Sequence, residues 1–194
     1  MGWTSCSNIQ AFWASLRNKL TNDPSNVNIS LISDTHGHLD SRLLRHLEGS
    51  DEIWHAGDIG SLDVTDALES IAPCRAVFGN IDDHKVRSTW PEHQRFDVEG
   101  LRVWMTHIGG RPPKYAKGIL RELKKDPPDV FICGHSHVLL VKKDPQWGGL
   151  HMNPGAAGRS GFHHQCTMMK FSIASRQIND LRVIEWPRSQ SDRK

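Results

Sequence analysis

Five short apolar runs in this 194-residue sequence are each followed directly by a turn that combines glycine with Asp, Asn or His. Helical patterns separate the first three runs, and this alternation predicts an α/β layer with mainly parallel strands. In open α/β sheets, ligands bind outside the carboxyl ends of the strands. The pattern therefore predicts one ligand site assembled from several turns. The turns are residues 33–37, 57–60, 79–82, 106–110 and 134–137.

The remaining pattern predicts a mixed sheet arrangement with helices outside. An antiparallel hairpin is expected around Glu99-Gly100, because β-rich runs flank this turn. The last four runs are expected to form a closing antiparallel set. The predicted strands are 28–33, 52–56, 75–78, 94–98, 101–105, 129–133, 138–141, 150–152, 167–173 and 178–185, and the predicted helices are 41–47, 64–70 and 115–125.

The two ends of the chain are predicted to lie outside the domain. Residues 1–26 are expected to form an extension with a short amphipathic helix at 8–20, residues 27–187 the domain, and residues 188–194 a charged tail. The first ten residues lack the basic and apolar segments typical of a secretory signal, so none is expected, and no apolar run approaches the ~20 residues of a membrane-spanning helix. The four cysteines form no C-x-x-C pair, which favours free thiols.

The charge balance limits the expected partners. Lys and Arg number 24 against 22 Asp and Glu, so the formal net charge is only +2. This value argues against general nucleic-acid binding and against a polybasic membrane anchor. We therefore expect a cytoplasmic protein that binds neither membranes nor specific nucleic acids, and whether it forms a homo-oligomer is left open.

The spacing of the polar residues in the turns predicts a metal centre. Residues two apart in an extended segment point to the same face, so Asp34 with His36, and His135 with His137, each present two ligands to one place. Seven oxygen or nitrogen ligands exceed what one tetrahedral ion takes and suit two ions that share a carboxylate. Imidazole with carboxylate favours divalent Mn, Fe, Zn or Ni. The seven predicted metal ligands are Asp34, His36, Asp58, Asn80, His107, His135 and His137.

The charge of such a centre indicates its substrate. Two divalent ions with two carboxylates and one hydroxide keep a net positive charge, which favours an anionic substrate such as a phosphate ester. Two ions ~3.5–4 Å apart also clamp the attacking and leaving oxygens of an in-line displacement and acidify the water between them. The sequence therefore predicts hydrolysis at phosphorus with a small phosphate ester as substrate.

The five blocks, in this order, resemble those of the calcineurin-like metallophosphoesterases. Gly79-Asn80-Ile81-Asp82 and Asn153-Pro154-Gly155 resemble the small single-domain phosphodiesterase branch. The resemblance implies an α/β fold in which two mixed β-sheets pack as a sandwich with helices on the outside. It also implies a hydroxide between two metals that attacks phosphorus, with diesters rather than monoesters as substrates. Asp34, His36, Asp58 and His137 would hold one metal, Asp58, Asn80, His107 and His135 the other, with Asp58 as the bridge.

One position departs from the family pattern. Many members have His directly after the asparagine, where it protonates the leaving group, but Ile81 stands there in this chain. Either water or another histidine would then supply the proton, or the leaving group would need little help. No catalytic residue is assigned. The candidate histidines are His38, His84, His163 and His164.

Other polar residues near the turns allow two interpretations each. Asp82 is expected to cap the helix that follows it. His55 either supports a metal ligand through a hydrogen bond or simply packs. Arg111, Lys114 and Arg159 either contact the substrate or are solvated surface cations. Residues expected to be structural are His46, His93 and His151.

Two other functions compete with a phosphoesterase. A non-catalytic metal-binding scaffold or interaction protein on the same fold would be signalled by lost ligands, and none of the seven is missing. A dinuclear amidohydrolase or peptidase would use bridging groups from Glu or Lys, which these turns lack. The complete ligand set favours the metal-dependent phosphoesterase.

Overall fold

A computed structural model of the chain describes residues 26–188. The predicted helix at 8–20 and all but the first residue of the predicted tail lie outside the described residues. Among the described residues, no helix combines the length and the apolar character needed to cross a membrane.

The first sheet contains the three parallel strands that the alternating pattern predicts. Strand β1 lies between β2, which runs parallel to it, and β11, which runs antiparallel, so the sheet is mixed. The strand order is β12-β11-β1-β2-β3. The strands are β1 (Val27–Ile32), β2 (Glu52–His55), β3 (Cys74–Ala76), β11 (Gln165–Ala174) and β12 (Gln177–Pro187).

The second sheet is also mixed. The predicted hairpin forms its edge as β4 and β5, and β8 lies parallel to both β5 and β10. The order is β4-β5-β8-β10-β9. The strands are β4 (His93–Val98), β5 (Leu101–Thr106), β8 (Val130–Ile132), β9 (Leu140–Lys143) and β10 (Leu150–Asn153), and a separate small hairpin pairs β6 (Gly110–Arg111) with β7 (Lys114–Tyr115).

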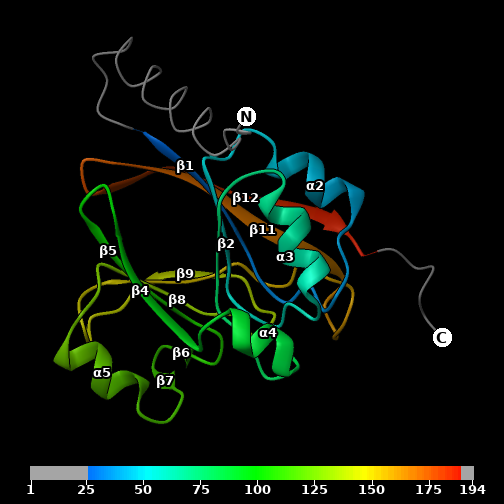
Figure 1. Cartoon of the computed structure of the whole chain (residues 1–194). Coiled ribbons are helices and arrows are strands. Elements are labelled where there is room, and N and C mark those ends of the chain that lie inside the picture. Colours follow the sequence, from blue (N-terminus) through cyan, green and yellow to red (C-terminus); the bar gives the residue numbers. More distant parts are fainter. Residues whose placement is uncertain (1–25, 189–194) are drawn as a thin grey trace, which may run out of the picture.

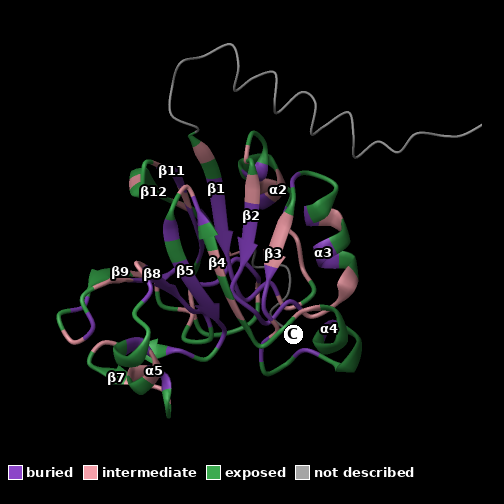
Figure 2. Cartoon of the chain, turned by 60° about the vertical axis from the view of Figure 1, so that its left-hand side comes forward, coloured by how far each residue is buried: buried purple, intermediate pink, exposed green. Residues whose placement is uncertain are grey.

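The two sheets pack face to face with helices on both outer sides (Figure 1). One apolar cluster, with Leu31 and Trp54 from the first sheet and Val103 and Ile132 from the second, fills the space between them. A second cluster joins the first sheet to helices α2 (Ser41–Leu47), α3 (Leu62–Glu69) and α4 (His84–Thr89), and a third joins the second sheet to α5 (Ile119–Lys125). Figure 2 shows β1, β2 and β5 as largely buried. The predicted sandwich with outer helices is confirmed.

Two predicted details are wrong. The helix expected at 115–125 begins only at Ile119, because Tyr115 pairs with Gly110 in the small hairpin and Gly118 adopts a left-handed φ of 86°. The last four strands do not form one antiparallel set. β9 and β10 belong to the second sheet, where β10 runs parallel to β8, and β11 and β12 complete the first.

Candidate metal centre

The turns after the strands meet at one end of the sandwich because backbone hydrogen bonds join them beyond the strands. The Asp34 amide donates to the Gly57 carbonyl at 2.9 Å, and the His36 amide donates to the Asp58 carbonyl at 3.0 Å. The Gly134 amide donates to the His107 carbonyl at 3.0 Å. These bonds extend both ladders into the loops and place the predicted ligands side by side.

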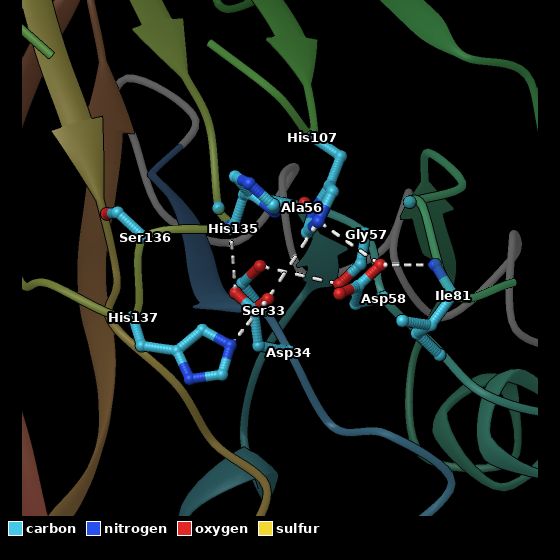
Figure 3. A network of polar contacts seen from close by, with 12 residues as sticks. Ser33, Asp34, Ala56, Gly57, Asp58, Ile81, His107, His135, Ser136 and His137 are labelled. Carbon is cyan, nitrogen blue, oxygen red and sulfur yellow. Dashed lines mark hydrogen bonds and ion pairs between the residues drawn. The ribbon is translucent and has the colours of Figure 1, made fainter. Parts of the chain in front are cut away.

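Six of the seven predicted ligands form two groups. In each group the potential ligand atoms lie within 4.8 Å of one another. Figure 3 shows the carboxylates of Asp34 and Asp58 facing each other, with the imidazoles of His107 and His137 directed at them. The groups are Asp34, His36 and His137, and Asp58, His107 and His135.

Asp58 lies between the two groups. Its Oδ1 atom lies 3.1 Å from His107 Nε2, and its Oδ2 atom lies 3.6 Å from His36 Nε2. One carboxylate oxygen therefore faces each group. Asp34 is placed similarly, since its Oδ1 atom lies 3.2 Å from His137 Nε2 and 3.9 Å from His107 Nε2.

The backbone is strained where these side chains are attached. Five of the seven predicted ligands have a positive φ, between 49° and 66°. Non-glycine residues rarely adopt this region, and such strain persists where the surrounding structure enforces it, often at functional sites. The conformation directs both side chains of each i, i+2 pair into the cluster. The five residues are Asp34, His36, Asp58, His135 and His137.

Two glycines allow the turns to approach this closely. A Cβ on Gly79 would lie 2.1 Å from Asp58 Oδ1, and a Cβ on Gly134 would lie 2.0 Å from Ser33 Oγ. Both distances are far below van der Waals contact. Glycine is therefore required at both positions if the carboxylates are to keep their places.

The site carries buried charge. Asp34 is fully buried and Asp58 is 2% exposed, and among the described residues their ion-pair partners are all histidines. Burial alone would raise the pKa of Asp58, but the hydrogen bond and charge of His107 outweigh it and lower that pKa. Burial opposes a charged His107 as well, yet Asp58 and Asp34 raise its pKa. Each residue therefore favours the charged form of the other.

These residues fit divalent metal ions. The buried Asp34 Oδ1 and His36 Nε2 atoms have no hydrogen-bond partner in the described structure, although each faces groups of the opposite polarity. Buried polar atoms left in this way are costly unless a ligand satisfies them. Carboxylate oxygens and imidazole nitrogens that converge without a thiolate suit Mn, Fe, Zn or Ni.

Asn80 stands apart from the other six predicted ligands. It is exposed, and it lines a cavity of about 400 Å³ together with His107. Among the described contacts, none joins its side chain to either carboxylate. The next residue, Ile81, contributes its backbone amide, which donates to Asp58 Oδ1 at 3.1 Å.

The four histidines considered as acids differ in position. His163 packs its ring on that of His137 with centroids 5.3 Å apart, whereas His84 begins α4 and is exposed. The His163 Nε2 atom lies 3.0 Å from the Gly158 carbonyl, which can only accept a proton, so this nitrogen carries the hydrogen. His164 is exposed, and His38 is half-buried in the first turn. In this arrangement His163 has no proton free for a leaving group.

Asp82 holds two turns of the site together, and its predicted role as a helix cap is wrong. Its carboxylate accepts from the amides of Ile59, Gly60 and Gly79, at 3.1, 2.6 and 2.7 Å. The cap of α4 is the next residue, Asp83, which accepts from the amides at the start of that helix.

His55 acts behind the predicted metal ligands. Its Nδ1 atom accepts from the Gly57 amide at 3.2 Å, so Nε2 carries the hydrogen and donates to Thr35 Oγ1 at 2.8 Å. Thr35 in turn donates to the Ile59 carbonyl at 3.0 Å. The imidazole therefore connects the turns that carry Asp34 and Asp58, and neither of its bonds is to the side chain of a predicted metal ligand.

The buried His55 predicts acid sensitivity. Burial lowers its pKa from 6.5 to about 4, more strongly than the nearby carboxylates raise it. In the unfolded chain His55 is protonated below about pH 6.5, whereas in the folded chain it is protonated only below about pH 4. The free energy of unfolding therefore falls as the pH falls from 6.5 to 4. At pH 5 we expect a loss of about 2 kcal/mol from this group relative to pH 8.

Denaturant unfolding of the metal-free protein at both pH values measures the effect. His55→Gln keeps a donor for Thr35 but does not titrate, so its stability should fall by about 2 kcal/mol less than that of the wild type over the same range. His46→Gln, at an exposed position, is the control. If the free energy of unfolding depends on pH equally in the wild type and in His55→Gln, the lowered pKa of His55 is contradicted.

Comparisons of the chain with known proteins identify its family. The calcineurin-like phosphoesterase superfamily domain matches residues 27–176. A protein named "Probable metallophosphoesterase" from Methanothermobacter thermautotrophicus is 32% identical over 134 residues, which cover 66% of this chain and 76% of the relative.

Solved structures share the fold. A novel archaeal phosphodiesterase has a TM-score of 0.66 at 21% identity, with 82% of this chain and all of that chain covered. Vacuolar protein sorting 29 (Vps29) from Cryptosporidium parvum has a TM-score of 0.61 at 18% identity, with 85% of this chain and all of that chain covered. With the domain match over most of its length and two carboxylate–histidine groups at its strand ends, the chain belongs to the calcineurin-like phosphoesterase superfamily.

Proposed function

We propose that this protein is a metal-dependent phosphodiesterase with two divalent ions, and that residues 27–187 form its catalytic domain. The observation that carries the proposal is the position of Asp58, with one oxygen facing each ligand group. Asp34, His36, Asp58 and His137 would hold one ion, and Asp58, Asn80, His107 and His135 the other. When bound, such ions would neutralise phosphate charge and lower the pKa of a coordinated water.

The protein itself positions the reacting groups. Asp58 is fixed by the Ile81 amide, and His107 Nδ1 lies 2.8 Å from the Ala56 carbonyl, which orients the Nε2 atom toward the carboxylates. A metal-ligating histidine is commonly oriented in this way by a bond from its other nitrogen. The left-handed turns hold the remaining ligands. The substrate phosphate is therefore expected to meet a rigid, preorganised set of groups.

The missing acid favours esters with good leaving groups, and the lower charge of the phosphate favours diesters. Ile81 replaces the histidine that protonates leaving groups in many family members, and His163 has its proton engaged by Gly158. Without such an acid, hydrolysis is fastest when the leaving group departs without a proton. A diester phosphate also carries one negative charge fewer than a monoester dianion and resists attack less. The archaeal neighbour characterised as a phosphodiesterase supports the same choice.

A test compares two chromogenic esters on the full chain. Loaded with Mn, Fe, Zn or Ni, the protein should hydrolyse bis(nitrophenyl) phosphate with a higher kcat/KM than nitrophenyl phosphate, and chelation should abolish both activities. Each ion held at 100 times its Kd should also stabilise the fold by ~2.7 kcal/mol, measured as a metal-dependent rise in the free energy of unfolding. Faster hydrolysis of the monoester would contradict the diester assignment.

A second candidate function is a metal-binding interaction protein. It is favoured by three large apolar side chains that stand exposed next to predicted ligands: Ile81 and Ile108, each 45% exposed, and Val138, 48% exposed. Vps29 structures share the fold. Two bound ions without turnover of any phosphate ester would favour this function over the enzyme.

A further inference from the structure

A cavity of about 300 Å³ lies behind the loop that carries His135 and His137. It is lined by the β6–β7 hairpin on one side and by β9 and β10 on the other. Its charged lining residues are Arg111, Lys114 and Lys142, and no acidic residue lines it. The cavity is therefore strongly cationic.

Strand register places these cations together. Arg111 and Lys114 are directly opposed partners of the small hairpin, so their side chains share one face. Lys142 is the partner of His151 across β9 and β10, so these two side chains also share a face. His151 packs on Tyr115 and Phe131, which identifies that face as the outer one, toward the hairpin.

The carboxylate of Asp144 acts on His151 and accepts from the Tyr115 hydroxyl, and it pairs with none of the three cations. Within residues 26–188, neither Arg111, Lys114 nor Lys142 forms an ion pair or a side-chain hydrogen bond. Like charges that face each other across a strand pair are destabilising. Three cations around one hollow without a carboxylate are stabilised when an anion binds between them.

The lining also offers uncharged polar atoms. His151 is fully buried, and its Nδ1 atom has no hydrogen-bond partner in the described structure. Ser136 Oγ accepts from the Val138 amide at 3.3 Å and from Asn153 Nδ2 at 3.1 Å, which leaves its own hydrogen to donate. A phosphate, with several acceptor oxygens and one oxygen that can carry a proton, satisfies such groups together with the cations.

The cavity adjoins the metal centre. Ser136 stands between His135 and His137, and Figure 3 shows its side chain pointing away from Asp34 and Asp58. Asn153 Nδ2 also donates to the Gly134 carbonyl at 2.9 Å, which fixes the loop between the two sites. The cationic cavity and the carboxylate cluster thus lie on the two sides of one short loop.

We propose that this cavity is a phosphate-binding subsite that holds a second phosphate group carried by the substrate. The role rests on the proposed phosphodiesterase function, which would place the scissile phosphate at the carboxylate–histidine groups. Arg111 supplies a planar, two-pronged donor, and Lys114 and Lys142 supply point charges. The substrate class is then a phosphodiester that bears an additional phosphate.

Inorganic phosphate tests the subsite directly. Equilibrium dialysis of the zinc-loaded full chain should find two phosphates per chain, one at the metals and one in the cavity. The triple variant Arg111→Gln/Lys114→Gln/Lys142→Gln should retain only the first. A matched control, Arg121→Gln/Lys124→Gln/Lys125→Gln, removes the same charge from exposed positions on α5 and should bind both. One phosphate per wild-type chain, or two per triple-variant chain, would overturn the subsite.

Kinetics tests whether the phosphate belongs to the substrate. The nitrophenyl ester of thymidine 5′-phosphate is compared with the same ester carrying a 3′-phosphate. The added phosphate should raise kcat/KM roughly 10- to 100-fold in the wild type and the control, and the triple variant should lose this gain while it cleaves the simpler ester at the wild-type rate. Two bound phosphates without any gain would mean that the cavity takes free phosphate, and would overturn the substrate assignment. Absence of turnover with the cavity phosphate still bound would instead contradict the proposed function.

Discussion

Asp58→Asn should abolish phosphoester hydrolysis. The substitution keeps the size of the side chain and an oxygen that can accept from the Ile81 amide, but it removes the charge that faces both ligand groups. We expect kcat/KM for bis(nitrophenyl) phosphate to fall at least ~1,000-fold, which corresponds to about 4 kcal/mol of transition-state stabilisation. Metal analysis should find fewer than two ions per chain.

A matched variant separates this effect from a general loss of negative charge. Asp66→Asn removes a carboxylate from an exposed position on α3 and should keep full activity and both ions. Asp58→Asn without metal should still unfold in one cooperative transition, which shows that the loss is not one of folding. Activity within tenfold of the wild type in Asp58→Asn would refute the shared-carboxylate centre.

The site was largely predictable from the sequence because its residues lie in local patterns. Asp34 and His36 follow one strand at a spacing of two and share one ligand group, as predicted, whereas His135 and His137 follow another strand and fall into different groups. All four have a left-handed φ, and not the extended backbone from which the grouping was predicted. The left-handed φ of these residues was not predictable, since it is imposed by bonds between turns such as that from His36 to Asp58. Their role as metal ligands remains a prediction.

The errors arose where distant segments decide the structure. Tyr115 stands four residues before Ile119, which stands four before Leu123, so the apolar spacing favoured one long helix. Gly118 and the pairing of Tyr115 with Gly110 end that pattern. The parallel pairing of β10 with β8 likewise joins segments that are distant in the sequence, which short apolar runs do not encode.

The role of Asp82 also depends on distant turns, so it was not predicted from the sequence. Its removal should strongly destabilise the fold. The carboxylate is 4% exposed and accepts from three backbone amides in two turns of the site. In Asp82→Ala these amides lose their acceptor within a buried region, at a cost of about 1–3 kcal/mol each when left unsatisfied. We expect the free energy of unfolding to fall by about 3–5 kcal/mol, a large share of the ~5–15 kcal/mol typical of a domain.

Two further variants make this expectation specific. Asp82→Asn retains one acceptor oxygen, and its free energy of unfolding should fall by roughly 1–2 kcal/mol. It therefore tests the bonds of Asp82 to the three amides even if Asp82→Ala does not fold. Asp83→Ala removes the exposed cap of α4 next to it and should cost about 1 kcal/mol with activity intact. Denaturant unfolding in chelator and diester hydrolysis in metal measure the series. Because the Asp82 carboxylate joins the turns of Asp58 and Asn80, activity should fall in the same order as stability. Equal losses in Asp82→Ala and Asp83→Ala would show that Asp82 does not hold these turns.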